Sequence, residues 1–270
     1  MLLSLVLTLK PTKDCNLPLT TGNFAHACFL NLVSRADDAL AKDLHEQRRD
    51  KPFTISPLQG EFTNQRGRLS LKAGKEYWLR ITSLEDTLSN LLLDLAKKPP
   101  KSLVLKEEEF EIKRMTASSD EAGWACAATY EELYNFRIPV PWPLDYRIRM
   151  KFYSPTTFRS NGQNIPLPLP NLVFFGLAQK WNRFSPIDLG SDISKIAAGR
   201  LTLSRYDLAT KMLDFGKYRQ IGFVGEAEFT IKRERDDLLP RVLHLLADFA
   251  FYAGVGYKTT MGMGQVRRIG

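Results

Sequence analysis

The order in which strand-like and helix-like segments follow one another constrains the fold of this chain more than any other feature. Strands show apolar side chains at alternate residues or in short runs, whereas helices show them at spacings of three and four. In the first half these patterns predict a strand, a helix, two strands, a helix and a strand, at residues 2–9, 24–33, 52–58, 77–82, 84–97 and 102–113. Thr20 or Thr21 is expected to cap the first helix, and a further helical stretch follows at 39–46. The pattern indicates a βαββαβ unit.

The second half repeats this order with weaker local signals. Its elements are expected at residues 147–152, 170–181, 201–215, 222–232, 238–252 and 264–269. Between the halves, residues 114–146 are poorly periodic, and Pro139, Pro141 and Pro143 favour a rigid extended connector. We therefore predict an α+β fold of two tandem ferredoxin-like (RRM-like) βαββαβ modules, at 1–140 and 141–270, with a C-terminal glycine-rich loop.

Positive charge is concentrated in the second half of the chain. The net charge is +8, and residues 1–140 hold 19 basic and 19 acidic side chains, whereas residues 141–270 hold 19 basic and 11 acidic ones. Strict alternation from Arg147 to Phe152 places Arg147, Arg149 and Lys151 on one face of a strand. This asymmetry favours a polyanion as partner, although a basic surface kept for solubility explains the charge alone equally well.

The residues also argue against several classes of protein. No apolar run approaches the roughly 20 residues that a membrane-spanning helix needs. Met1 to Leu9 lacks the basic start and the cleavage site of a secretory signal, so the cytoplasm is the expected location. Cys15, Cys28 and Cys126 form no CxxC pair, which argues against a zinc site or a disulfide framework. With no HExxH motif and no ligand-spaced carboxylates, we expect neither metal nor cofactor.

The most distinctive segment is the glycine-rich run from Gly254 to Gly264. Tyr257 precedes Lys258 and only six residues follow Gly264, so neither a P-loop nor a dinucleotide fingerprint fits. We expect a loop from the last helix into the last strand, where the glycines let a nucleic-acid backbone or another strand approach closely. Its backbone N–H groups and Lys258 would then meet a phosphate. A tight structural connection is the alternative interpretation.

Four segments in this order resemble the Cas6 endoribonucleases of CRISPR systems, namely 44–46 leading to 51–56, 154–159, 222–225 and the glycine-rich run. The resemblance covers nearly the whole chain. It implies two ferredoxin-like modules and metal-independent cutting of precursor CRISPR RNA within its repeats, by attack of a ribose 2′-hydroxyl, to give mature guide crRNAs. The implied partners are precursor and mature repeat RNA, together with other Cas effector subunits. A catalytically inactive repeat-RNA-binding subunit of an effector complex is the alternative, because some members of the family lack activity.

The resemblance also implies catalytic residues. His45 and Lys51 match a catalytic histidine and lysine of archaeal members, but Leu30 stands where those members supply a tyrosine. His26, one helical turn before Leu30, could replace that tyrosine or be the principal acid or base itself. Imidazole suits both proton transfers because its ordinary pKa is about 6.5. Both histidines stay candidates, with His45 preferred; the structural alternatives are a core residue for His26 and a helix cap for His45. His244 is expected to be a packing or surface residue and is not a candidate.

Candidate RNA-binding residues come from the basic side chains and from the glycine-rich loop. Double-stranded RNA would be recognised by shape and phosphates, and unpaired bases by stacking and edge contacts. The candidates are Arg48, Arg49, Arg147, Arg149, Lys151, Arg159, Lys217, Arg219, Lys232, Arg233, Gly254, Gly256, Lys258, Gly262 and Gly264. Tyr206, Tyr218 and Tyr257 are candidates for base stacking.

Overall fold

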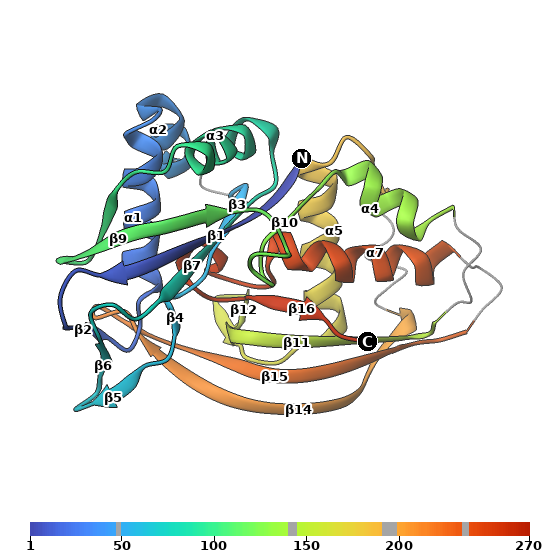
Figure 1. The fold of residues 1–270 in the computed structure, drawn as a ribbon. Coiled ribbons are helices and arrows are strands. Elements are labelled where there is room, and N and C mark those ends of the chain that lie inside the picture. Colours follow the sequence, from blue (N-terminus) through green and yellow to red (C-terminus); the bar gives the residue numbers. More distant parts are fainter. Residues whose placement is uncertain (47–49, 140–144, 191–198, 234–237) are drawn as a thin grey trace. The chain divides into compact units, whose positions relative to one another are not determined.

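The computed structural model spans residues 1–270 and describes all of them except 47–49, 140–144, 191–198 and 234–237 (Figure 1). Two compact units make up the chain. The first comprises Met1–Ala127, Leu213–Arg219 and Thr260–Gly262, and the second comprises Ala128–Met212, Gln220–Thr259 and Met263–Gly270. The first unit therefore takes two short segments from late in the sequence.

The first unit contains a five-strand path of antiparallel pairs with the strand order β3-β7-β1-β9-β8. Its elements are β1 (Leu2–Pro11), β2 (Cys15–Pro18), α1 (Gly22–Ser34), α2 (Asp38–Glu46), β3 (Phe53–Ile55), β4 (Gln59–Gly60), β5 (Thr63–Gln65), β6 (Arg68–Leu71), β7 (Tyr77–Ser83), α3 (Asp86–Lys97), β8 (Ser102–Leu105), β9 (Glu108–Thr116) and β10 (Cys126–Ala128). In the succession β1-α1-β3-β7-α3-β9, the first and third strands lie side by side in the middle of the sheet. This arrangement is the ferredoxin-like one, as predicted.

The core of the first unit follows from the period of its strands. Leu3, Leu5, Leu7 and Leu9 alternate along β1 and are almost completely buried. They belong to one apolar cluster that includes residues of α1 and α3, such as Phe29 and Leu92. The hydrophobic face of β1 thus packs against both helices on one side of the sheet. This packing fixes the position of α1, which carries His26.

The opposite face of the same sheet buries an arginine. Arg80 on β7 is 1% exposed, and its Nε donates to Ser4 Oγ at 2.7 Å. The Arg80 guanidinium carbon lies 5.0 Å from the centroid of the Trp124 ring. Because a buried charge needs hydrogen bonds or a π face to replace its water, Ser4 and Trp124 make this position tolerable.

The second unit repeats the topology. Its elements are α4 (Tyr130–Arg137), β11 (Arg147–Thr156), β12 (Phe158–Ser160), β13 (Gln163–Ile165), α5 (Pro170–Phe184), β14 (Leu201–Asp214), β15 (Arg219–Ile231), α7 (Leu238–Ala253) and β16 (Val266–Arg268). The 3-10 turn η1 (Thr259–Met261) begins in this unit, but its residues Thr260 and Met261 belong to the first unit. The sheet order β14-β15-β11-β16 again places the first and third strands of the βαββαβ succession together. The prediction of two tandem ferredoxin-like modules is confirmed.

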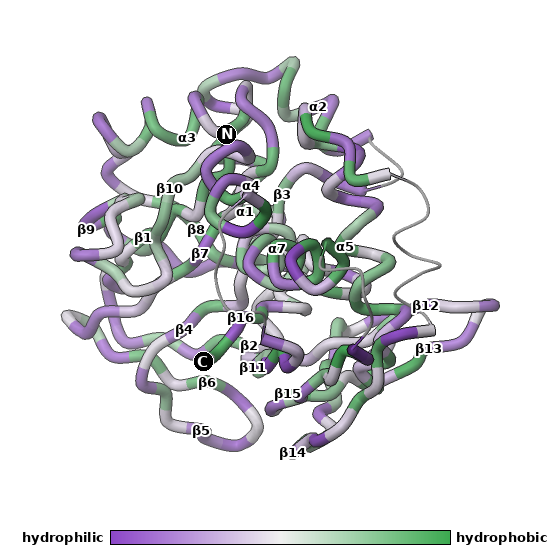
Figure 2. The backbone as a smooth tube through the Cα atoms, turned by 90° about the vertical axis from the view of Figure 1, so that its right-hand side faces the viewer, coloured by the Kyte–Doolittle hydropathy of each residue, from purple (hydrophilic) through white to green (hydrophobic). Residues whose placement is uncertain are grey.

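Strand β11 shows the predicted division into two faces. Ile148, Met150 and Phe152 are buried, whereas Arg147 and Arg149 are exposed. The adjoining hairpin β12–β13 is hydrophilic at its tip (Figure 2). No helix of the described ranges is long and apolar enough to cross a bilayer.

Three local expectations were wrong. The single strand expected at 102–113 is the hairpin β8–β9, which turns at Lys106 with a φ of 62°. The segment expected to be a plain linker carries α4, where Thr129 and Glu132 form a capping box that the hydrophobic periodicity does not reveal. Within the predicted connector, residues 140–144 lie outside the described residues.

The third correction concerns the start of α1. Thr21 occupies the N-cap position but makes no side-chain cap hydrogen bond. Its Oγ1 instead accepts from the backbone N–H of Leu58 at 2.9 Å, and Thr20 Oγ1 accepts from the N–H of Asp214 at 3.0 Å. Both threonines therefore connect α1 to other segments of the first unit, because those segments present N–H groups that need acceptors.

His244 on α7 serves packing in the second unit, and its environment predicts a dependence of stability on pH. Its Nε2 donates to the carbonyl oxygen of Asp145 at 2.9 Å, and its Nδ1 accepts from Arg268 at 3.3 Å. Burial lowers the pKa of His244, the Asp145 carbonyl opposes this, and the charges of Arg268 and Arg137 add to the lowering. A second proton on Nδ1 would displace the hydrogen bond from Arg268, so the fold favours the neutral ring.

We expect the free energy of unfolding to fall as the pH drops below about 6.5, the ordinary pKa of histidine. The unfolded chain then binds the proton first, so stability present above that pH is lost as the pH falls toward the lowered folded pKa. Urea titrations at pH values between 7.5 and 5.0 measure this change in the free energy of unfolding. The His244→Gln variant should show a weaker pH dependence than the wild type, and an equal dependence in both proteins would contradict this assignment.

Candidate functional site

His26 is held by three segments of the first unit. It lies half-buried on α1, and its ring stacks on Phe53 of β3 with the centroids 5.9 Å apart. Its Nδ1 lies 3.1 Å from the carbonyl oxygen of Thr260, in the glycine-rich run. A carbonyl oxygen can only accept, so Nδ1 carries the proton and donates it. In the neutral ring, Nε2 therefore keeps its lone pair and can take a proton.

The charges around His26 favour its neutral form. Burial lowers the pKa of His26 below its ordinary value of 6.5, the hydrogen bond to Thr260 opposes this, and the electrostatic effects of Lys51 and His45 add to the lowering. The ring is consequently neutral at neutral pH and able to act as a base. Lys51 and His45, the other two predicted catalytic residues, therefore lie within electrostatic range of His26.

Lys51 acts on the end of α2. Its Nζ donates to the carbonyl oxygen of Leu44 and, at 3.0 Å, to that of His45. A cation at a helix C-terminus satisfies unpaired carbonyl groups and interacts favourably with the helix dipole. Burial lowers the pKa of Lys51. Lys51 is thus bound to the backbone at the end of the helix that carries His45, whose own side chain is exposed. The catalytic assignment of both residues stays a prediction.

Close packing explains how Thr260 reaches His26. The N–H of Gly262 donates to the carbonyl oxygen of Ile55 at 3.1 Å, which fixes the segment Thr260–Gly262 beside β3. Gly22, at the start of α1, has no room for a side chain, because a Cβ there would collide with the carbonyl oxygen of Met261. The absence of a Cβ at Gly22 therefore allows the glycine-rich run to lie against the helix that carries His26.

The glycines of the run are needed by the protein itself. Gly256 and Gly264 have φ values of 85° and 71°, which favour glycine. A Cβ at Gly256 would collide with the carbonyl oxygen of Thr157, and one at Gly264 with that of Val255. Internal packing accounts for these positions, as the alternative interpretation held. Contact of Gly254, Gly256, Gly262, Gly264 and Lys258 with RNA stays a prediction.

Most of the basic RNA-binding candidates are exposed. Those with exposed side chains are Arg147, Arg149, Arg159, Lys217, Arg219, Lys232 and Arg233, whereas Lys151 and Lys258 are half-buried. Lys151 forms an ion pair with Glu226 at 2.8 Å, and Arg219 forms one with Asp214 at 3.4 Å. Arg48 and Arg49 lie outside the described residues. Within the first unit, Lys217 and Arg219 belong to the tip of the β14–β15 hairpin, and the other exposed candidates belong to the second unit.

Of the three tyrosines predicted to stack on bases, Tyr257 contacts an arginine and Tyr218 contacts a neighbouring ring. The guanidinium carbon of Arg159 lies 5.8 Å from the ring centroid of Tyr257. Tyr218 is 41% exposed and stacks on Phe215 with centroids 5.2 Å apart, and Tyr206 is 63% exposed. The assignment of all three rings to base stacking stays a prediction.

Sequence reasoning missed the groups that orient His26. Phe53 stands inside the segment 51–56 that carries the resemblance, but nothing in its apolar character indicates a stacking role. Thr260 contributes only its backbone carbonyl oxygen, which every residue possesses. Among the described residues, no three His, Cys, Asp or Glu side chains gather closely enough to hold a metal ion.

Comparisons with known proteins agree with this fold. The model of the family "CRISPR Cas6 N-terminal domain" matches residues 1–135, and that of "CRISPR-associated endoribonuclease Cas6" matches residues 150–266. A CRISPR-associated endoribonuclease Cas6 of Mycobacterium tuberculosis is 32% identical over 127 residues, which are 46% of this chain and 40% of that protein. The matched part thus spans less than half the length of this curated relative.

Solved structures match over the full chain. One, described as a Cas6 product complex, is 30% identical with a TM-score of 0.81 and covers 100% of both chains. Cas6 of Thermus thermophilus is 28% identical with a TM-score of 0.74, covering 100% of this chain and 98% of that one. The similarity therefore includes both units.

Proposed function

The chain belongs to the Cas6 family of CRISPR-associated endoribonucleases, and from this premise we propose that it cuts CRISPR repeat RNA in precursor transcripts to give mature crRNAs. The observation that supports a catalytic residue for this proposal is the hydrogen bonding of His26. Its Nδ1 is engaged by the Thr260 carbonyl at 3.1 Å, which leaves Nε2 as the basic nitrogen. The structural relative described as a product complex supports RNA as the substrate.

The proposed reaction needs no metal ion. Nε2 of His26 takes the proton of a ribose 2′-hydroxyl, the 2′-oxygen forms a bond to the adjacent phosphorus, and the bond from phosphorus to the 5′-oxygen breaks. The departing 5′-oxygen receives a proton from a second group, for which His45 is the proposed donor. The products are a 2′,3′-cyclic phosphate and a free 5′-hydroxyl, so protons and bonds balance.

Positive side chains would complete the site. Charge builds up on the phosphate oxygens during the attack, and preorganised cations stabilise it. Lys51 is within electrostatic range of His26 and holds the end of the helix that carries His45. The exposed basic candidates of both units would contact the remaining phosphates, which predicts that affinity falls steeply with salt.

A metal-free assay tests the reaction. We expect labelled repeat RNA to be cut at the same rate with excess EDTA, and a single 2′-deoxy substitution at the cut site to abolish cutting while leaving affinity unchanged, because only the attacking group is removed. Gel analysis of products and a filter-binding titration measure the two effects. Loss of cutting in EDTA would contradict the metal-independent reaction. Binding without cutting under every ionic condition would instead favour the inactive RNA-binding subunit.

A further inference from the structure

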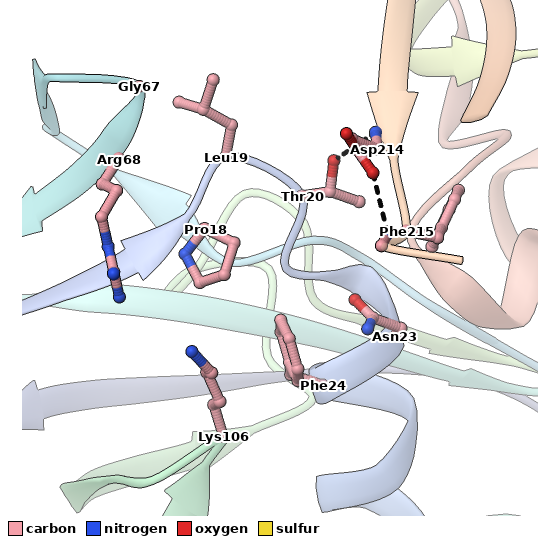
Figure 3. Close-up of a pocket in the computed structure, with 11 residues that line it drawn as sticks. Pro18, Leu19, Thr20, Asn23, Phe24, Gly67, Arg68, Lys106, Asp214 and Phe215 are labelled. Carbon is pink, nitrogen blue, oxygen red and sulfur yellow. Dashed lines mark hydrogen bonds between the residues drawn. The ribbon is translucent and has the colours of Figure 1, made fainter. Parts of the chain in front are cut away.

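A cavity of about 480 Å³ opens in the first unit at the beginning of α1 (Figure 3). Its walls come from the end of β2, the start of α1, β6, the turn between β8 and β9, and the tip of the β14–β15 hairpin. A cavity of several hundred Å³ is of the size that encloses small ligands, and a single nucleotide fits that range. None of its cationic or aromatic side chains was among the predicted RNA-binding residues.

The cavity combines apolar walls with an aromatic ring. Phe24 is half-buried on α1, and Pro18 and Leu19 form the adjoining wall (Figure 3). Leu19 is 52% exposed, so a large apolar side chain faces solvent at this place. Aromatic and apolar side chains around a concave site are the surroundings that a nucleobase stacks against.

Two cations line the same cavity. Lys106 Nζ lies 5.9 Å from the centroid of the Phe24 ring. Arg68 uses one nitrogen to donate to the carbonyl oxygen of Asn16 at 2.8 Å, which fixes its guanidinium and leaves further N–H groups. The acidic lining residue, Asp214, accepts from the N–H of Gly216 at 2.8 Å and pairs with Arg219 at 3.4 Å. With that carboxylate compensated, the cavity favours an anionic group beside its aromatic wall.

Asn23 supplies an unused polar group. Its Oδ1 is buried and has no hydrogen-bond partner among the described residues. An acceptor left in this state carries a desolvation cost that a donor on a ligand would remove. The exocyclic amino group of adenine, cytosine or guanine is such a donor, whereas uracil has no amino group and donates through its ring N3–H. Asn23 also precedes His26 by three positions on α1, so the cavity lies about one helical turn from the proposed base.

We propose that this cavity binds one unpaired nucleotide of the RNA substrate, with an amino-bearing base against Phe24 and Asn23 and with its phosphate between Arg68 and Lys106. The inference rests on the proposed function and adds a subsite to it. A nucleotide combines an amino group, a flat aromatic ring and an anionic phosphate. The amino group matches Asn23, the ring matches Phe24, and the phosphate matches Arg68 and Lys106. The nucleotide held there would fix the register of the RNA relative to His26.

The experiment uses variants that keep the fold. Lys106→Gly removes the ammonium at a position with a φ of 62°, where glycine is conformationally favoured, and Arg68→Gln keeps an amide donor for Asn16. Arg66→Gly is the matched control, because it removes a cation at a φ of 50° from a residue outside the lining. All proteins are titrated with repeat RNA blocked by 2′-deoxy at the cut site, and with a set of such RNAs that each carry one abasic unpaired nucleotide.

We expect the double variant Lys106→Gly/Arg68→Gln to bind the intact RNA about tenfold more weakly, as the loss of phosphate contacts predicts, and Arg66→Gly to change affinity by less than about twofold. One abasic position should weaken wild-type binding and have no further effect in the double variant. If no abasic position is coupled to the cavity, the inference is overturned while the proposed function stands. If no repeat RNA binds to any of the proteins, the proposed function itself fails.

A second arm separates RNA from free nucleotides. Adenosine 5′-monophosphate is titrated into the wild-type protein and the double variant by calorimetry. We expect it to bind at least about 100-fold more weakly than the RNA, since the neighbouring phosphates are missing. Tighter binding of the free nucleotide than of the RNA, lost in the double variant, would overturn the RNA subsite.

Discussion

Replacing His26 by alanine is expected to lower the single-turnover rate of repeat RNA cutting by about 10²–10⁴-fold, the usual contribution of a positioned acid or base. The affinity for RNA blocked by 2′-deoxy should stay unchanged, because the proposed role of His26 is the transfer of a proton. His26→Asn is the sharper variant. Its amide can donate to the same Thr260 carbonyl that now accepts from Nδ1 at 3.1 Å, but it cannot take a proton. Both variants should therefore lose the chemical step.

The pH dependence of the wild-type cutting rate tests whether His26 acts as the base. Because burial and nearby charge lower the pKa of His26 below 6.5, the rate should hold at neutral pH and decline only on the acid side of that value, where Nε2 becomes protonated. His45→Ala is measured in parallel. Full activity of His26→Asn together with loss in His45→Ala would assign the base to His45 and refute the proposed role of His26.

Replacing Gly22 by alanine is expected to damage both stability and cutting. The added methyl group would collide with the Met261 carbonyl oxygen, a backbone atom that cannot yield without moving the segment Thr260–Gly262. Overpacking of this kind typically costs about 1–3 kcal/mol of unfolding free energy. The same displacement would break the hydrogen bond that orients His26, and a misplacement near 1 Å lowers rates by about 10²-fold.

Gly176 offers a matched control for this substitution. It lies in helix α5, and a Cβ added there meets nothing within 4 Å. Gly176→Ala should therefore raise the unfolding free energy by about 0.5–1 kcal/mol, as alanine does in a helix, and leave the rate of cutting unchanged. Chemical denaturation and single-turnover kinetics measure the pair. If Gly22→Ala behaves like Gly176→Ala in both, the close approach of the glycine-rich run to α1 does not orient His26.

The predictions that succeeded rest on local periodicity. Alternation along β1 and β11 determines which side chains face the core, and the strand and helix succession determines a ferredoxin-like order in each unit. The predictions that failed concern features without a period. A turn at Lys106 splits one expected strand, and a capping box at Thr129 starts a helix in an expected linker. Turns and caps depend on a few polar contacts, so hydrophobic patterning does not report them.

The candidate site shows the same division. The resemblance selected His26, His45 and Lys51, and the fold brings them within electrostatic range. It could not indicate that Lys51 donates to the end of α2, or that Nδ1 of the half-buried His26 meets the carbonyl oxygen of Thr260. Those distinctions depend on burial and on which nitrogen meets a carbonyl oxygen. Neither the burial of a side chain nor its hydrogen-bond partner is a property of the residue type.

The amino-acid order by itself determined the two βαββαβ units, the basic second half and a choice among three histidines, because strand and helix periods, charge and residue type are local properties. Only the tertiary structure decided the tautomer of His26, the internal use of the glycines and the cavity beside Asn23. Each of these joins atoms from segments as distant as α1 and the glycine-rich run. Such contacts form when packing brings together backbone and side-chain groups that are remote in the sequence, and no local sequence pattern encodes which remote groups meet.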